Sequence, residues 1–167
     1  MITRPFDEIS VGDAWSGRGR TITETDVVSF CYLTGNWLEI HSNVEVAAAT
    51  SYGQRLVQGS LTFSLIPGLV AWDHRYVAAF YGVDRLRFLR PVFIGDTVHP
   101  ELRVVETTPK DDDRGVVALA VEVRNQRDEV VQAGVFKLLV RRGSLPLCDT
   151  AAAVGTTDPR TEGCTDG

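Results

Sequence analysis

The chain has 167 residues, of which 44% are hydrophobic and 23% are charged. That length and composition predict a single domain with a packed core and argue against global disorder. The net charge of −5 argues against nucleic acid as the main partner, because binding to a phosphate backbone favours positive charge.

Two features bear on where the protein works. The N-terminal sequence "MITRPFDEIS" has no apolar stretch of signal-peptide length, and the longest apolar passage, residues 61–72, is interrupted by Ser64, Pro67 and Gly68. That passage is too short to span a bilayer. The three cysteines are odd in number and scattered, a pattern typical of a reducing compartment without a disulfide framework. We therefore expect a cytoplasmic protein without a membrane partner.

The first half of the chain predicts helices. Residues 21–36 carry a start signal, with Thr23 as N-cap and Asp26 three residues on as an approximate capping box, and a stop signal at Gly35–Asn36. A short helix follows over residues 44–50. A longer helix begins at residues 59–60 and continues to residue 73, apolar all round as a buried helix would be. The pair at residues 67–68, Pro-Gly, predicts a kink or break inside it.

The second half changes to strand-like alternation. Apolar residues alternate at positions 86 and 88, at 92 and 94 after the interruption by Pro91, and at 102 and 104. The sequence "GDT" at residues 95–97 predicts a turn, and "PKDDDRG" at residues 109–115 predicts a charged loop. Residues 116–142 predict two further strands joined at "NQRDE".

The order of these elements predicts an α+β fold. A small strand near the N-terminus, then helices, then consecutive antiparallel strands favour a sheet packed on one long buried helix. We assign residues 1–142 to this domain and residues 143–167, which are small and polar, to a disordered tail. A small sheet has exposed edges, and a dimer that joins two sheets would protect them.

The chain contains three histidines, at positions 41, 74 and 99. No pair of them has metal-ligand spacing, and the sequence has neither a phosphate-binding glycine loop nor a G-x-S-x-G elbow. We therefore expect no metal and no cofactor. His41 follows a turn and precedes a polar pair, so it is a candidate to line a cleft; alternatively it only bonds a backbone carbonyl. His74 lies at the expected end of the long helix, where a cation interacts favourably with the helix dipole, and His99 lies at a strand end, so both suggest structural roles.

Gly59 at the start of the long helix is the second candidate. A helix N-terminus presents free N–H groups, and a glycine there lets a substrate approach the backbone closely, which suits a developing oxyanion. The alternative is that Gly59 permits tight packing against the sheet. Gln58 and Ser60, its neighbours, are further candidate site residues.

Five segments carry a resemblance to a known family. They are distributed over nearly the whole of residues 6–142, and the run F-x-x-P-V-x-x-G-D-T within them is especially specific. They are "FDEISVGD", "TITETDVVSFCYLTGN", "SYGQRLVQGSLTFSL", "LRFLRPVFIGDTV" and "VRNQRDEVVQAGVFKLLV". In these segments the chain resembles the MaoC-like branch of the hotdog-fold hydratases and dehydratases, which includes the (R)-specific enoyl-CoA hydratases.

The resemblance implies a single hotdog fold, an antiparallel sheet wrapped around a central helix, dimerised as a homodimer or higher homo-oligomer. It implies an acyl thioester of coenzyme A or of a carrier protein as substrate. The reaction would add water to a trans-2-enoyl group or remove it from an (R)-3-hydroxyacyl group.

The family motif Gly-Asp-x-Asn-Pro-x-His supplies an acid–base pair, and a His-Gly at the helix start supplies an oxyanion donor. Here His41 and Gly59 match this pattern. The chain departs from it at four positions, because Asn36 replaces Asp, Leu38 replaces Asn, Glu39 replaces Pro, and Gln replaces His before Gly59.

The loss of the carboxylate leaves three hypotheses open. His41 acts alone as base and acid while Asn36 holds the water, which is the reading we favour. Alternatively Glu39 supplies the carboxylate, since it shares a face with His41 if the segment is extended. In the third, the site no longer dehydrates anything, and the protein is a hotdog acyl-thioesterase or a non-catalytic acyl-thioester-binding partner subunit.

An anionic coenzyme calls for positive charge near the site. Arg85, Arg87 and Arg90 cluster around the strand expected at residues 85–90, with Arg85 and Arg87 alternating onto one face, and Arg55 precedes the helix that begins at residue 59. We expect Arg55, Arg85 and Arg87 to contact the phosphates of the pantetheine-bearing substrate.

Overall fold

The structure, a computed structural model, describes residues 2–143. In chain order its elements are η1 (Phe6–Glu8), β1 (Ala14–Ser16), β2 (Arg20–Thr21), α1 (Glu24–Thr34), α2 (Glu39–Ser42), α3 (Val44–Ala48), α4 (Gly59–Leu69), β3 (Val77–Phe88), β4 (Thr97–Pro109), β5 (Arg114–Asn125) and β6 (Val130–Arg141). Apart from Gly143, the predicted tail lies outside the described residues, so its disorder stays a prediction.

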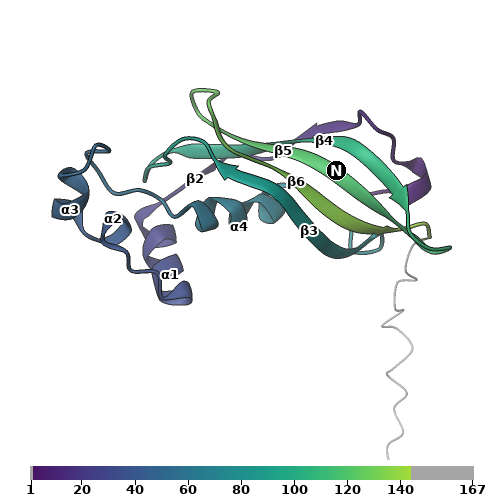
Figure 1. The fold of residues 1–167 in the computed structure, drawn as a ribbon, viewed down its shortest axis with the longest axis horizontal. Coiled ribbons are helices and arrows are strands. Elements are labelled where there is room, and N and C mark those ends of the chain that lie inside the picture. Colours follow the sequence, from purple (N-terminus) through teal and green to yellow (C-terminus); the bar gives the residue numbers. More distant parts are fainter. Residues whose placement is uncertain (1, 144–167) are drawn as a thin grey trace, which may run out of the picture.

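One six-stranded antiparallel sheet organises the fold. Its order is β1-β4-β5-β6-β3, and β2 pairs with β4. The connections between β4, β5 and β6 fall at residues 110–113 and 126–129, within the loop and turn predicted from the sequence. The sheet curves over helix α4, while α1, α2 and α3 lie together at one end of the molecule (Figure 1). The predicted α+β arrangement of a sheet wrapped on a helix is confirmed.

The hydrophobic core lies between α4 and the inner face of the sheet. Helix α4 contributes Leu61 and Ile66, and the sheet contributes fully buried side chains such as Leu119 and Phe136. Within residues 2–143, no helix is long and apolar enough to cross a membrane.

Helix α1 forms as its local signals predict. The Thr23 hydroxyl accepts from the Asp26 N–H, and the Asp26 carboxylate accepts from the Thr23 N–H, which completes the capping box. Burial opposes ionisation of Asp26, but its hydrogen bonds with Thr23 and its ion pair with Arg20 outweigh that effect and hold its pKa below the ordinary value. At the other end Gly35 adopts φ +71°, the left-handed C-cap conformation that favours glycine.

Helix α4 begins where it was predicted to but ends earlier. It stops at Leu69 rather than at residue 73, two residues after Pro67, whose ring cannot donate to the helical ladder. The expectation of an all-round buried helix is wrong, because Ser60 and Ser64 are exposed. One face of α4 packs on the sheet and the other faces outward.

Strand β3 is the largest difference from the sequence prediction. It extends from Val77 to Phe88, whereas the alternation predicted only its last residues, and positions 92 and 94 lie outside any strand. Register shifts interrupt its pairing with β6 at three places, so its burial does not follow a period of two. Without that period the sequence carries little strand signal over residues 77–85.

Candidate functional site

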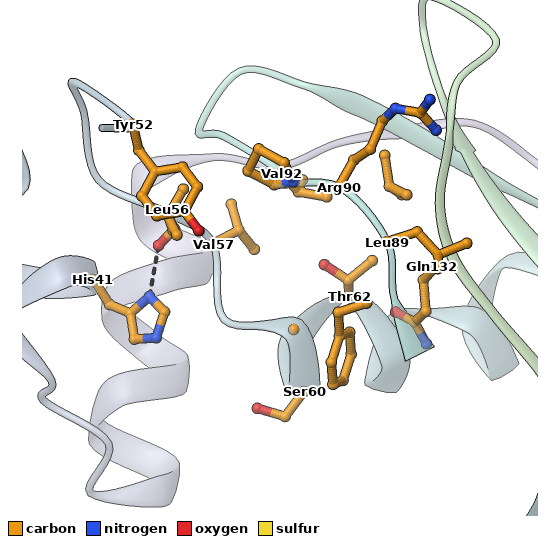
Figure 2. Close-up of a pocket in the computed structure, with 14 residues that line it drawn as sticks. His41, Tyr52, Leu56, Val57, Ser60, Thr62, Leu89, Arg90, Val92 and Gln132 are labelled. Carbon is orange, nitrogen blue, oxygen red and sulfur yellow. Dashed lines mark hydrogen bonds between the residues drawn. The ribbon is translucent and has the colours of Figure 1, made fainter. Parts of the chain in front are cut away.

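A cavity of about 450 Å³ opens beside the N-terminus of helix α4. Helices α2 and α4, the segment between β3 and β4, and strand β6 all contribute to its wall (Figure 2). The lining residues are His41, Tyr52, Leu56, Val57, Gly59, Ser60, Thr62, Phe88, Leu89, Arg90, Pro91, Val92, Val131 and Gln132. Three of the residues singled out from the sequence, His41, Gly59 and Ser60, therefore meet at one hollow.

His41 is held in one orientation by a backbone carbonyl. Its Nδ1 lies 2.8 Å from the Leu56 carbonyl oxygen, the hydrogen bond drawn in Figure 2. Because a carbonyl oxygen can only accept, Nδ1 carries the proton, and in the neutral ring Nε2 keeps its lone pair. The His41 ring therefore bonds a backbone carbonyl, as one sequence-based alternative expected, and it also lines the cavity.

The segment that supplies this carbonyl is itself held by backbone hydrogen bonds to two other parts of the chain. The Leu56 N–H donates to the Ile40 carbonyl at 3.0 Å, and the Val57 N–H donates to the Val92 carbonyl at 2.8 Å. Helix α2 and the chain before β4 are therefore tied together through residues 56–57. This connection fixes the His41 ring relative to the start of α4.

The start of α4 has unused backbone donors. Its N-cap, Gln58, makes no side-chain capping bond, and the N–H groups of Leu61 and Thr62 both donate to the Gln58 carbonyl. Helix geometry leaves the N–H groups of Gly59 and Ser60 without an intrahelical acceptor. Both residues line the cavity, so these donors and the positive end of the helix dipole lie where an oxyanion would be stabilised.

Gly59 is also a position of close packing. A Cβ atom built there would lie 2.7 Å from ring carbons of Phe88, nearer than real Cβ contacts. The two roles expected for Gly59, access to the backbone and tight packing, therefore coexist. Its neighbour Gln58 is 1% exposed, donates to the Cys31 sulfur at 3.0 Å, and does not line the cavity.

The residues that were to complete the acid–base pair lie outside the lining. The Asn36 side-chain oxygen accepts from the Leu38 N–H at 3.4 Å, so it is engaged in its own turn. Glu39 is exposed and accepts from the Asn43 amide. The extended segment on which the Glu39 hypothesis depended is absent, because residues 39–42 form helix α2 and side chains two apart on a helix do not share a face.

None of the three arginines expected to bind phosphates lines the cavity. Arg55 pairs with Glu24 at a separate hollow. Arg85 sits at an irregularity of β3 with φ +54°, so it and Arg87 do not follow the simple alternation expected of them. Arg90 does line the cavity, and its Nη1 donates to the Val130 carbonyl at 3.1 Å.

Sequence reasoning missed several polar lining residues. Tyr52, Thr62 and Gln132 come from a loop, a helix and a strand far apart in the chain, and only the fold brings them to one wall. Thr62 lies three positions after Gly59, but no signal distinguished it in the sequence, because Ser60 and Ser64 are polar residues of the same helix. Gln132 interrupts an apolar strand, but no local pattern relates it to His41.

The other histidines take no part in this site. His74 follows the end of α4 by five positions, in a turn, so the expected interaction with the helix dipole is wrong. His99 is the third residue of β4. Over residues 2–143 no group of three or more His, Cys, Asp or Glu side chains is arranged to hold a metal ion.

Comparison with known proteins places this chain in a family. Residues 10–126 match the MaoC like domain, and the chain belongs to that family. It is also similar in fold to a Mycobacterium tuberculosis protein described as having a double hotdog fold, at a TM-score of 0.73 and 22% identity over 93% of this chain and 51% of that one. The fold is accordingly a hotdog fold.

Individual relatives give the extent of the likeness. The chain is 39% identical over 106 residues to Protein MaoC of Klebsiella aerogenes, covering 63% of this chain but only 32% of that protein. It is 29% identical over 110 residues to an (R)-specific enoyl-CoA hydratase of Rhodospirillum rubrum, covering 66% and 76% of the two chains. The solved structure of a monoamine oxidase regulatory protein from Archaeoglobus fulgius superposes at a TM-score of 0.79 with 39% identity, covering 87% of this chain and 100% of that one.

The close approach of Gly59 to Phe88 predicts an unusual response to alanine. Alanine normally stabilises a helix over glycine by about 1 kcal/mol, but at this site its Cβ would overlap the ring. We expect Gly59→Ala to lower the free energy of unfolding by about 1–3 kcal/mol in urea titrations. The same change in a Phe88→Ala background should be neutral or stabilising.

Gly68→Ala is the matched control, since Gly68 lies in the same helix and a Cβ there would meet nothing within 4 Å. It should leave stability unchanged or raise it. Equal effects of Gly59→Ala with and without the Phe88 ring would contradict the packing role.

Proposed function

We propose that this chain is a hydratase or dehydratase of acyl thioesters, interconverting a trans-2-enoyl thioester and water with the (R)-3-hydroxyacyl thioester. The observation that carries the proposal is the pairing of His41, whose Nε2 is free as a base, with the free N–H groups at the start of α4. The name of the Rhodospirillum rubrum relative, an (R)-specific enoyl-CoA hydratase, supports it.

The chemistry divides between these two features. The thioester oxygen accepts from the Gly59 N–H, which draws electron density from C3 and stabilises the enolate that forms when water attacks. His41 Nε2 removes a proton from that water as the C3–O bond forms. The imidazolium then returns a proton to C2, so the enzyme ends in its starting protonation state. Dehydration is the reverse sequence.

Asn36 distinguishes this chain from the family pattern. An amide cannot exchange a proton, but its nitrogen can donate a hydrogen bond that orients the reacting water. Its oxygen already accepts from Leu38 within the turn, which leaves the amide nitrogen for that purpose. We therefore assign both proton transfers to His41 and positioning of the water to Asn36, whose amide nitrogen would have to turn toward the cavity that it does not line in this structure.

The substrate carrier is an acyl-CoA or an acyl-carrier-protein thioester in this proposal. Arg90, at the cavity wall and about half exposed, is better placed than Arg85 or Arg87 to meet a phosphate of the carrier. Its guanidinium points away from the other labelled lining residues and outward (Figure 2), which suits contact with a group outside the acyl cavity.

Loss of the base should remove activity. We expect His41→Ala to lower kcat/KM for hydration of trans-2-enoyl-CoA by about 10²-fold or more, followed as loss of the conjugated enoyl thioester. His74→Ala, which changes an exposed histidine outside the cavity, should leave the rate unchanged. Free thiol, measured in the same samples, should not accumulate.

The rival functions give different results in this assay. Thiol release without hydration would replace the proposal with a thioesterase. Binding of acyl thioesters without either reaction, across a panel of chain lengths, would leave a non-catalytic partner subunit.

Restoring the carboxylate provides a separate test of Asn36. We expect Asn36→Asp to raise kcat by about 10-fold or more, because it adds a second acid–base group. Asn36→Ala should lower kcat with little change in substrate binding. Identical rates in all three proteins would show that Asn36 does not contact the reacting water.

We also propose that the chain is a homodimer. Strand β3 is an edge of the sheet, paired only with β6, and carries exposed aromatic side chains at Phe80 and Tyr81. An apolar edge of this kind favours pairing with another sheet. Light scattering of the purified protein should report about twice the 18.3 kDa chain mass; a monomer at micromolar concentration would contradict the proposal.

A further inference from the structure

Two buried polar side chains on the cavity wall lack hydrogen-bond partners. Thr62 and Gln132 are each 2% exposed, and within residues 2–143 neither the Thr62 hydroxyl nor either polar atom of the Gln132 amide has a partner. Both line the cavity. Figure 2 displays them on one side of it, with His41 on the other.

Such groups are costly to leave unsatisfied. Nearly all buried polar atoms in proteins are hydrogen-bonded, and an orphaned donor or acceptor loses its hydration without compensation. The surrounding lining residues, Leu89, Val92 and Val131, are apolar and supply no side-chain partner. A cavity shaped only for a hydrocarbon chain would be lined more favourably by leucine or methionine here.

The two side chains define what ligand group would satisfy them. Gln132 has both a free donor and a free acceptor, so the conclusion does not depend on which way its amide is oriented. A ligand hydroxyl, which both donates and accepts, can pair with one atom of the Gln132 amide and with the Thr62 hydroxyl whichever way the amide is oriented. A carboxylate only accepts, would face the Gln132 oxygen, and finds no cation beside it, since Arg90 directs its guanidinium away (Figure 2).

The position of this group relative to the reacting atoms follows from helix α4. Thr62 is three residues after Gly59, which places it about 4.5 Å further along the helix axis. We take the acyl chain of a thioester bound at the Gly59 N–H to run along that direction, toward the wall that carries Thr62 and Gln132. The distal group would then lie roughly four or five bonds from the thioester carbon, well beyond C3.

We propose that Thr62 and Gln132 form a specificity site for a hydroxyl group near C5 of the acyl chain. The natural substrate would thus be a hydroxylated acyl thioester, not a plain fatty acyl thioester. This inference rests on the proposed function for its orientation of the ligand, and it adds the class of acyl group.

A matched substrate pair tests the specificity. In trans-5-hydroxypent-2-enoyl-CoA a hydroxyl occupies the place of the terminal methyl of trans-hex-2-enoyl-CoA, so size is nearly constant. We expect kcat/KM to favour the hydroxylated substrate by about 10- to 100-fold, because the methyl leaves buried polar groups unpaired. The ratio of dissociation constants for the saturated analogues, 5-hydroxypentanoyl-CoA and hexanoyl-CoA, should change in the same direction.

Variants of matched volume assign the preference to the two residues. Thr62→Val and Gln132→Met should each reduce the preference about 10-fold, mainly by improving the hexenoyl substrate, which a purely structural role would not do. Ser64→Ala, in the exposed part of the same helix, should keep the wild-type ratio. Unchanged ratios in both cavity variants, or a wild-type preference for the hexenoyl compound, would overturn the proposal. A preference for trans-glutaconyl-CoA, which carries a carboxylate at C5, over both would overturn the hydroxyl assignment.

The two levels of proposal fail separately. Hydration of both substrates without a preference would leave the hydratase function standing and remove the specificity site. No turnover of any substrate, with the hydroxylated analogue bound more tightly and the difference lost in Gln132→Met, would remove the hydratase function and keep the specificity site.

Discussion

Packing of helix α4 against the curved sheet is the contact on which the rest of the molecule depends. Leu61 and Ile66 on the helix meet side chains such as Leu119 and Phe136 on the sheet, and all four are buried. Each contributes about 1.5–3 kcal/mol by leaving water. Because this contact fixes the axis of α4, it also fixes where its N-terminal N–H groups point and which face of the helix meets the cavity.

The cavity histidine, His41, is positioned by a second, polar constraint. His41 lies on the four-residue helix α2, too short to be stable alone. The backbone bonds of residues 56–57 to Ile40 and Val92 tie that helix to the chain preceding β4, and the Leu56 carbonyl selects the tautomer of the ring. The orientation of His41 therefore rests on main-chain atoms, so the identity of residue 56 matters less than the path of its backbone.

The cavity has two chemically different ends. At one end lie His41 and the Gly59 N–H, and at the other lie Thr62 and Gln132. Helix α4 contributes to both, one turn apart. A single rigid helix thus sets the distance between the two ends of the cavity. Under the two proposals above, that fixed distance would let the site discriminate acyl thioesters by the position of a hydroxyl group on the chain.

Short-range sequence signals were sufficient to predict the helix ends and turns that are formed by neighbouring residues. The capping box of α1, the glycine that ends it, the start of α4 and the turns between the last three strands all follow from residues within about four positions of each other. The same holds for His41 and Gly59, which a short motif identifies as candidates. Such signals can be recognised in the sequence because helix capping and turn formation involve backbone groups that are close together in the chain.

Tertiary structure decided everything that joins distant residues. The irregular first half of β3 exists because it pairs with β6, the carbonyl that orients His41 comes from fifteen residues away, and Thr62 meets Gln132 only across the fold. Arg85 and Arg87, expected at the site, are kept from its lining by the irregular pairing of their strand. These outcomes depend on side-chain packing and strand register over the whole sheet. A short stretch of sequence does not determine the free energies of such long-range contacts.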